Sequence, residues 1–159
     1  MPSTARAQAE QGGVMGLFDP ISTAETGVNV SQTWLDSISE NIANMNDVVP
    51  TSEGAYQTRF VVAGTIPGQV EGTGPGSSTE ADIGGGTQVL GIALGSPDGI
   101  LTYEPDNPLA DKQGMVRVAD VNLGDQMSDM MMAQQGYEAN LATISQAEQA
   151  YQAALGLKV

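Results

Sequence analysis

Carboxylate side chains are the groups in this sequence whose types and spacing come nearest to chemistry. Several lie in the middle of the chain, at Glu71, Glu80, Asp82, Asp98, Glu104 and Asp106. Two such groups facing each other could act as acid and base in glycoside hydrolysis. The chain has only two Phe and one Trp for a sugar platform, which favours a solvated acidic surface. A small hydrolase that uses Glu104 and Asp106 is kept as a third hypothesis.

Metal and phosphate sites are not predicted either. Asp106, Asn107 and Asp111 resemble a fragment of a calcium loop, but Pro108 and Ala110 stand where oxygen ligands are needed. Turn formation explains this segment better. The glycines at 72–74 and 84–86 are not followed by Lys-Ser or Lys-Thr, so they do not predict a phosphate-binding loop. We expect no metal and no cofactor.

The residues that are absent narrow the functional classes further. The chain has no Cys and no His, which excludes disulfides, thiol catalysis and His-based triads. Lys112 and Lys158 are not in a Ser-x-x-Lys setting, so no enzyme is expected. Nineteen acidic against five basic residues give a net charge of −14, which argues against nucleic acid as a partner. No apolar run approaches the roughly 20 residues of a membrane span, and the N-terminus lacks the apolar core of a secretory signal peptide.

A heptad pattern predicts a helix over about 20–46, within an N-terminal helical segment 17–49. Gly27 weakens this helix, and Pro50 stops it from continuing. The predicted seam contains, in chain order, Ile21, Ala24, Val28, Ser31, Leu35, Ile38, Ile42 and Met45. Asn41 and Asn44 lie within these turns, and we expect their amides to contact a neighbouring helix or the middle of the chain.

A second helix is predicted over about 121–156, within a C-terminal segment 119–159. Its first apolar row is Leu123, Met130, Tyr137, Ile144 and Tyr151, and its second is Met127, Leu141 and Leu155. Both helices are acidic, and neither has a base before Lys158. Leu, Ile, Val and Phe make up about a fifth of the chain, which is little for an independent core. We therefore expect neighbouring subunits to cover part of the apolar surface, including the methionine run 126–141.

The middle of the chain, 50–118, predicts short strands at 55–66, 87–94, 99–103 and 114–118. A Gly-rich loop over 64–86 separates the first two, and Gly114 is expected in a left-handed turn position. Residues 1–16 are small and polar and are expected to be disordered, with Met15 as an alternative start. The prediction is an α+β fold, in which two terminal coiled-coil-type helices pack together and enclose a small β-rich region.

Three segments together resemble the proximal-rod proteins of the bacterial flagellar basal body. They are "NIANMND", "YEPDNPLADKQGMVRVADVN" and "GYEANLATISQAEQAYQAALGLK". The resemblance covers most of the chain from about Met15, and its most specific part is 103–122. The chain departs from the family pattern at Gln135, Gly136 and Glu148, where the family often has basic residues, and residues 1–14 precede the usual start.

The resemblance implies a non-enzymatic structural subunit of the proximal rod, which transmits torque for motility. It implies assembly with other rod proteins and copies of itself, and passage through the flagellar type III export apparatus into the periplasmic rod without a cleaved signal peptide. The assembly interface would comprise Ile21, Val28, Leu35, Ile38, Asn41, Ile42, Asn44, Met45, Leu123, Met127, Met130, Tyr137, Asn140, Leu141, Ile144, Tyr151 and Leu155. The alternative is a secreted, non-enzymatic binding protein or effector whose β-rich middle holds a ligand or partner.

Overall fold

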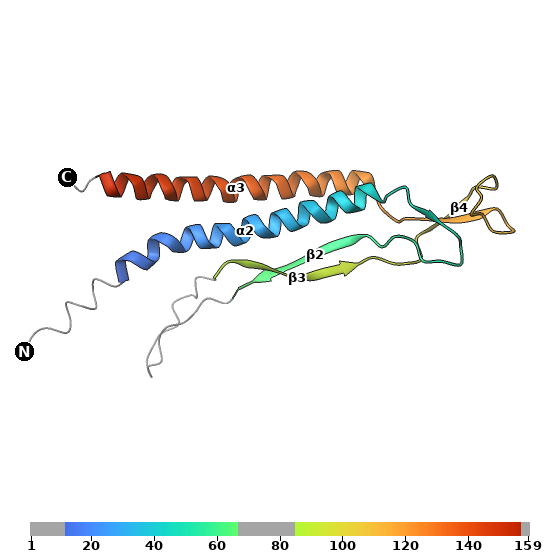
Figure 1. The fold of residues 1–159 in the computed structure, drawn as a ribbon, viewed down its shortest axis with the longest axis horizontal. Coiled ribbons are helices and arrows are strands. Elements are labelled where there is room, and N and C mark those ends of the chain that lie inside the picture. Colours follow the sequence, from blue (N-terminus) through green and yellow to red (C-terminus); the bar gives the residue numbers. More distant parts are fainter. Residues whose placement is uncertain (1–11, 67–84, 157–159) are drawn as a thin grey trace, which may run out of the picture. The chain divides into compact units, whose positions relative to one another are not determined.

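The computed structural model describes residues 12–66 and 85–156. In chain order the elements are helix α2 (Gly12–Ala43), strands β1 (Val48–Val49), β2 (Arg59–Thr65), β3 (Thr87–Leu94), β4 (Ile100–Tyr103) and β5 (Met115–Val118), and helix α3 (Leu123–Gly156) (Figure 1). The predicted α+β class is confirmed: in chain order, the strands of two small antiparallel sheets lie between the two helices. The predicted Gly-rich loop lies largely outside the described residues.

The chain divides into two compact units. One comprises Met1–Ser31, Ala63–Gln88 and Gln135–Val159, and the other comprises Gln32–Val62 and Val89–Gln134. Both long helices and the strands β2 and β3 pass through the two units, so each unit holds part of every one of these elements. Within each unit, a stretch of α2 lies beside a stretch of α3 (Figure 1).

Helix α2 differs from the prediction at both ends. It begins at Gly12, earlier than the predicted start near residue 20. It ends at Ala43. The backbone N–H of Asn44 still donates to the carbonyl of Glu40 (3.1 Å), and the chain turns after that residue. Val48 and Val49, which were placed in the helical segment, form the strand β1 instead. Both residues are β-branched, which suits a strand, and pairing with the distant strand β5 holds β1 in place.

Helix α3 begins at a polar cap. The side-chain oxygen of Asn122 accepts hydrogen bonds from the backbone N–H of Gly124 (2.9 Å) and Asp125 (3.4 Å), which would otherwise lack partners at the helix start. Asp125 lies in the first turn, where a negative charge favours the positive end of the helix dipole. The helix then runs to Gly156, in close agreement with the prediction.

A three-stranded antiparallel sheet has the order β1-β5-β4. Its central strand β5 pairs Val118 with Val48 on one side and with Ile100 on the other. Val116 in β5 is fully buried. The guanidinium of Arg117 donates to the carbonyl oxygens of Asp98 and Thr51, which ties the segments before β4 and after β1 to the central strand.

The turn between β4 and β5 is built around one aspartate. The Oδ1 atom of Asp111 accepts hydrogen bonds from the backbone N–H of Gln113 (2.8 Å) and Met115 (2.9 Å), and its Oδ2 atom accepts one from the Thr51 hydroxyl (3.1 Å). These bonds stabilise the carboxylate, and the bond from Met115 contributes most to lowering the pKa of Asp111. Gly114 has φ +76°, which confirms the predicted left-handed position.

The second sheet pairs β2 with β3. Backbone bonds flank it at both ends, from Gly95 N to Thr58 O (2.8 Å) and from Ile66 N to Gly86 O (2.9 Å), as expected for antiparallel strands. All four predicted strands are therefore present, with β2 starting four residues later than predicted. Every residue of β3 is exposed, which leaves this uncharged strand uncovered within the described parts of the chain.

Small residues allow the two helices to approach closely in the first unit. A Cβ atom added at Gly27 would lie 2.6 Å from the side-chain nitrogen of Asn140, and one added at Gly136 would lie 3.3 Å from the Ser31 hydroxyl. Asn140 in turn donates to the carbonyl of Gly136 (2.8 Å). Gly27 weakens the helix in isolation, but here it makes room for a polar side chain of α3.

Candidate assembly interface

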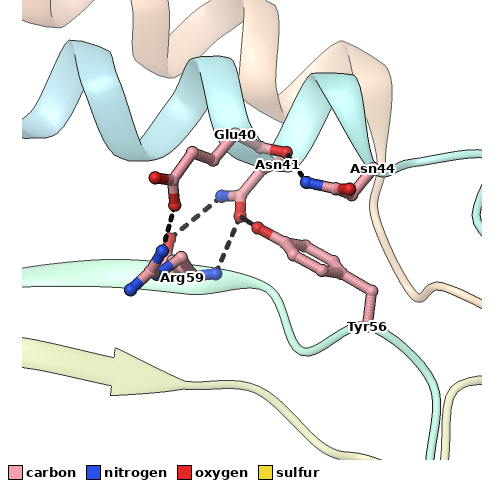
Figure 2. Close-up of polar contacts among 5 residues, drawn as sticks. All are labelled: Glu40, Asn41, Asn44, Tyr56 and Arg59. Carbon is pink, nitrogen blue, oxygen red and sulfur yellow. Dashed lines mark hydrogen bonds and ion pairs between the residues drawn. The ribbon is translucent and has the colours of Figure 1, made fainter.

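The side chain of Asn41 is the centre of the buried polar contacts in the second unit (Figure 2). It is 1% exposed and lies on the last turns of α2. Its Nδ2 atom donates to the carbonyl of Arg59 (2.9 Å) and to the side-chain oxygen of Gln126 (2.9 Å). Its Oδ1 atom accepts from the backbone N–H of Arg59 (2.8 Å) and from the hydroxyl of Tyr56 (3.0 Å).

This arrangement makes one amide act as a substitute for a neighbouring strand. An amide carries a donor and an acceptor side by side, which is the pattern that a strand edge presents. Asn41 uses both on the same residue of β2, Arg59, and the Nδ2 atom also donates to Gln126 on α3. The amide contacts expected for Asn41 are present, and they join three elements of the second unit.

The charged and phenolic groups around Asn41 support the same contact. Glu40, one residue earlier on α2, forms an ion pair with the Arg59 side chain (Figure 2). Burial raises the pKa of the Tyr56 phenol, and the negative charge of Glu40 raises it further. The phenol therefore stays protonated at neutral pH and keeps its hydrogen bond to Asn41.

Asn44 differs from Asn41 in its main contact. Its amide donates to the carbonyl of Glu40 (2.7 Å), four residues earlier on its own helix. The same carbonyl also accepts the backbone N–H of Asn44 (3.1 Å), so the side chain adds a second bond at the end of α2. The side chain of Asn44 thus serves its own helix end, and its contact with the Tyr56 phenol acts to lower the pKa of that phenol, whereas Asn41 bonds to both β2 and α3.

The predicted seam of α2 faces inward within the chain. Ala24 and Ile38 are 4% and 2% exposed, and Ser31 is buried as well. The other members, Ile21, Val28, Leu35, Ile42 and Met45, are half-buried. The heptad phase therefore identifies the covered face of α2. Whether any of these residues also contacts another subunit stays a prediction, and the side chain of Ile38 is taken up by the chain's own fold.

The predicted second row of α3 is offset by one residue from the covered face. Gln126 and Ala133 are buried, at 5% and 0% exposed, while the predicted Met127 and Leu141 are exposed. Asn140 is half-buried, as are the first-row residues Met130, Tyr137 and Ile144. At the two ends, Leu123, Tyr151 and Leu155 are exposed. The buried residues of α3 are small or polar, so a heptad pattern aligned on large apolar residues does not detect them.

Large apolar side chains consequently lie on the uncovered side of α3. Leu123, Met127 and Met131 follow one another at four-residue intervals and are 40%, 56% and 58% exposed. Residues at this spacing share one side of a helix. We call these three residues the α3 row. Its flexible methionine side chains are well suited to packing against an irregular partner surface.

Among residues 12–66 and 85–156, no group of acidic side chains is arranged to hold a metal ion. No helix in the same ranges is long and apolar enough to cross a membrane.

Comparison with known proteins identifies the class. Residues 112–157 match the family described as flagellar basal body rod FlgEFG protein, C-terminal. A flagellar basal-body rod protein FlgC of Borreliella burgdorferi is 32% identical over 149 residues, covering 90% of this chain and 98% of that protein. The FlgC proteins of Agrobacterium fabrum and Salmonella typhimurium are 32% and 28% identical, covering 81% and 82% of this chain and 88% and 90% of their own lengths.

The family match over residues 112–157, which spans β5 and α3, and the similar rod proteins identify the class as flagellar basal-body rod proteins. Within that class, the chain belongs to the FlgC family. The family resemblance predicted from the sequence is thereby confirmed, and with it the role of a structural rod subunit of the flagellar basal body. These relatives give no support to the alternative of a secreted binding protein.

Proposed function

We propose that this chain is a subunit of the proximal part of the rod and that it transmits torque through packing, without a catalytic step. Its partners are other rod proteins and copies of itself. It reaches the periplasmic rod through the flagellar type III export apparatus without a cleaved signal peptide. Membership of the FlgC family supports this proposal.

The observation that carries the proposal is the distribution of apolar side chains. The α3 row and the strand β3 expose large apolar residues, whereas the buried residues of α3 are Gln126 and Ala133, and α2 buries Ile38 beside small and polar residues such as Ala24, Ser31 and Asn41. Exposed patches of this kind mark interaction sites. The chain thus leaves many large apolar side chains on surfaces that a neighbour can cover.

The predicted assembly residues divide on this basis. We assign the contacts between subunits to the exposed members, Leu123, Met127, Leu141 and Leu155, and a supporting role within the subunit to buried members such as Ile38 and Asn41. Torque requires rigid subunits as well as tight contacts, so the second group serves function through stability.

Two neighbouring methionines provide a matched test. Met131 and Met132 are 58% and 52% exposed, but only Met131 belongs to the α3 row. We expect Met131→Asp to prevent incorporation into basal bodies and swimming, because the contact would bury an unpaired charge. We expect Met132→Asp to be incorporated. Urea unfolding of both purified variants should match the parent, since both sites are exposed.

Secretion is measured in the same strains. Export of Met131→Asp at the normal level, together with its absence from purified basal bodies, would place the defect at assembly. Normal swimming of cells that carry only Met131→Asp would refute the assignment of the α3 row to a subunit contact.

A further inference from the structure

The sheet β2-β3 exposes a second apolar surface in the same unit as the α3 row. Its members, which we call the sheet patch, are Phe60, Val62, Leu90, Ile92 and Leu94, and they are between 41% and 62% exposed. Leu90, Ile92 and Leu94 alternate along β3 and so share one face of that strand. Nothing within the described residues covers them.

Charge distinguishes the two surfaces. The strands β2 and β3 contain no acidic residue, and their only charged residue is Arg59. Helix α3 contains Asp125, Asp129, Glu138 and Glu148 and no base. A contact between two α3 helices would therefore place acids near acids, at a cost that a contact between α3 and the sheet avoids.

We propose that the sheet patch of one subunit packs on the α3 row of a second copy of this chain. The inference rests on the proposed function, because it names one contact by which copies would join within the rod. The acid-free sheet can approach the acidic helix of a copy whose net charge is −14, without like-charge repulsion at the contact.

The contact has a consequence for assembly. It joins two different surfaces, so a joined pair of subunits retains one free sheet patch and one free α3 row. Such head-to-tail contacts build closed rings or open helical arrays, in contrast to the closed dimers that self-complementary contacts build. A rod subunit requires this kind of contact.

The absence of cysteine from the chain allows a direct test. Two differently tagged copies, one with Leu90→Cys and one with Met127→Cys, are expressed together in the flagellated host. Isolated basal bodies are treated with a short flexible bis-maleimide, which joins two nearby thiols. We expect a cross-linked dimer that carries both tags. A second pair, Leu94→Cys with Met131→Cys, samples the same contact at a neighbouring position.

Three controls fix the interpretation. The mixed dimer should disappear when either variant is expressed alone, or when Met132→Cys replaces Met127→Cys. Dimers from Met127→Cys alone would indicate a contact between two helices, and dimers from Leu90→Cys alone a contact between two sheets. Either result would overturn the proposal, as would the absence of mixed dimers for both pairs.

Incorporation of the tagged parent chain into basal bodies is scored separately. Its absence would contradict the proposed function itself. Incorporation without any mixed cross-link would overturn only the contact between the sheet patch and the α3 row.

Discussion

Replacing Asn41 by alanine should destabilise the subunit far more than the same change at Asn44. The Asn41 amide makes four hydrogen bonds, with Arg59 N, Arg59 O, Gln126 Oε1 and the Tyr56 hydroxyl. Each net bond contributes about 1 kcal/mol. The half-buried Tyr56 hydroxyl regains water in the variant, so we expect Asn41→Ala to lower the free energy of unfolding by about 3 kcal/mol.

The matched control is Asn44→Ala. Its side chain donates to the Glu40 carbonyl at the end of its own helix, where water can replace it. We expect a change within about 0.5 kcal/mol. Urea unfolding of the purified chain reports both values through the fluorescence of Trp34, the only tryptophan, which is half-buried on α2 in the same unit as Asn41.

A nearly isosteric change separates hydrogen bonding from packing. Asn41→Asp keeps both acceptor contacts but places an oxygen where Nδ2 faced the Arg59 carbonyl. Burial and this repulsion raise the pKa of the introduced carboxyl in the folded chain. Its folded pKa then exceeds its unfolded pKa, so stability is retained at low pH and falls as the pH rises through the folded pKa. A pH-independent loss, or equal losses for Asn41→Ala and Asn44→Ala, would refute the reasoning.

Three further predictions concern the remaining turns and caps. Gly114→Ala should cost about 1–2 kcal/mol in thermal unfolding, because φ is +76° and the added Cβ would lie 2.8 Å from the Tyr103 ring, whereas Gly91→Ala, with open space around it, should be tolerated. The pKa of Asp111 is lowered in the folded chain, so its stabilising effect is present above its unfolded pKa and is lost as the pH falls through its folded pKa. We expect Asp111→Asn to weaken the loss of stability at acid pH, measured by urea unfolding. An unchanged dependence of stability on pH would contradict this prediction. Asn122→Ala should lower the free energy of unfolding by about 1 kcal/mol and speed amide hydrogen exchange in the first turn of α3, because Asn122 caps that turn. Faster exchange only in later turns would exclude a capping role.

The sequence predicts the strands better than it predicts how the helices face each other. The strands β3, β4 and β5 lie within one residue of their predicted bounds, because β-branched runs and flanking Gly or Pro are local signals. The strand β1 carries the same signal, two β-branched residues before Pro50, but it is only two residues long, and its pairing with β5 joins segments far apart in the chain. Local patterns therefore account for most elements but not for a contact between distant segments.

The error on α3 has a specific physical origin. Apolar size assigned Met127 and Leu141 to the covered face, yet Gln126 and Ala133 occupy it. Gln126 is drawn inward by the amide of Asn41, and the first unit brings Asn140 against Gly27. The available signals were the small residues and the amide side chains of α3. A heptad pattern aligned on these residues would have placed the covered face at Gln126 and Ala133, one residue before the predicted row.

That same offset explains how one helix can serve both the subunit and the assembly. If Met127 and Met131 were buried against α2, the subunit would gain core but would lose its apolar outer surface. Instead the inner face relies on close approach and on the Asn41–Gln126 bond, which is directional and so fixes how the two helices align. A slip of α3 along its neighbour would leave those buried amides without partners, at a cost of about 1–3 kcal/mol for each group. The amide contact thereby holds the α3 row in a fixed position, which is the condition for repeated, identical contacts along a rod.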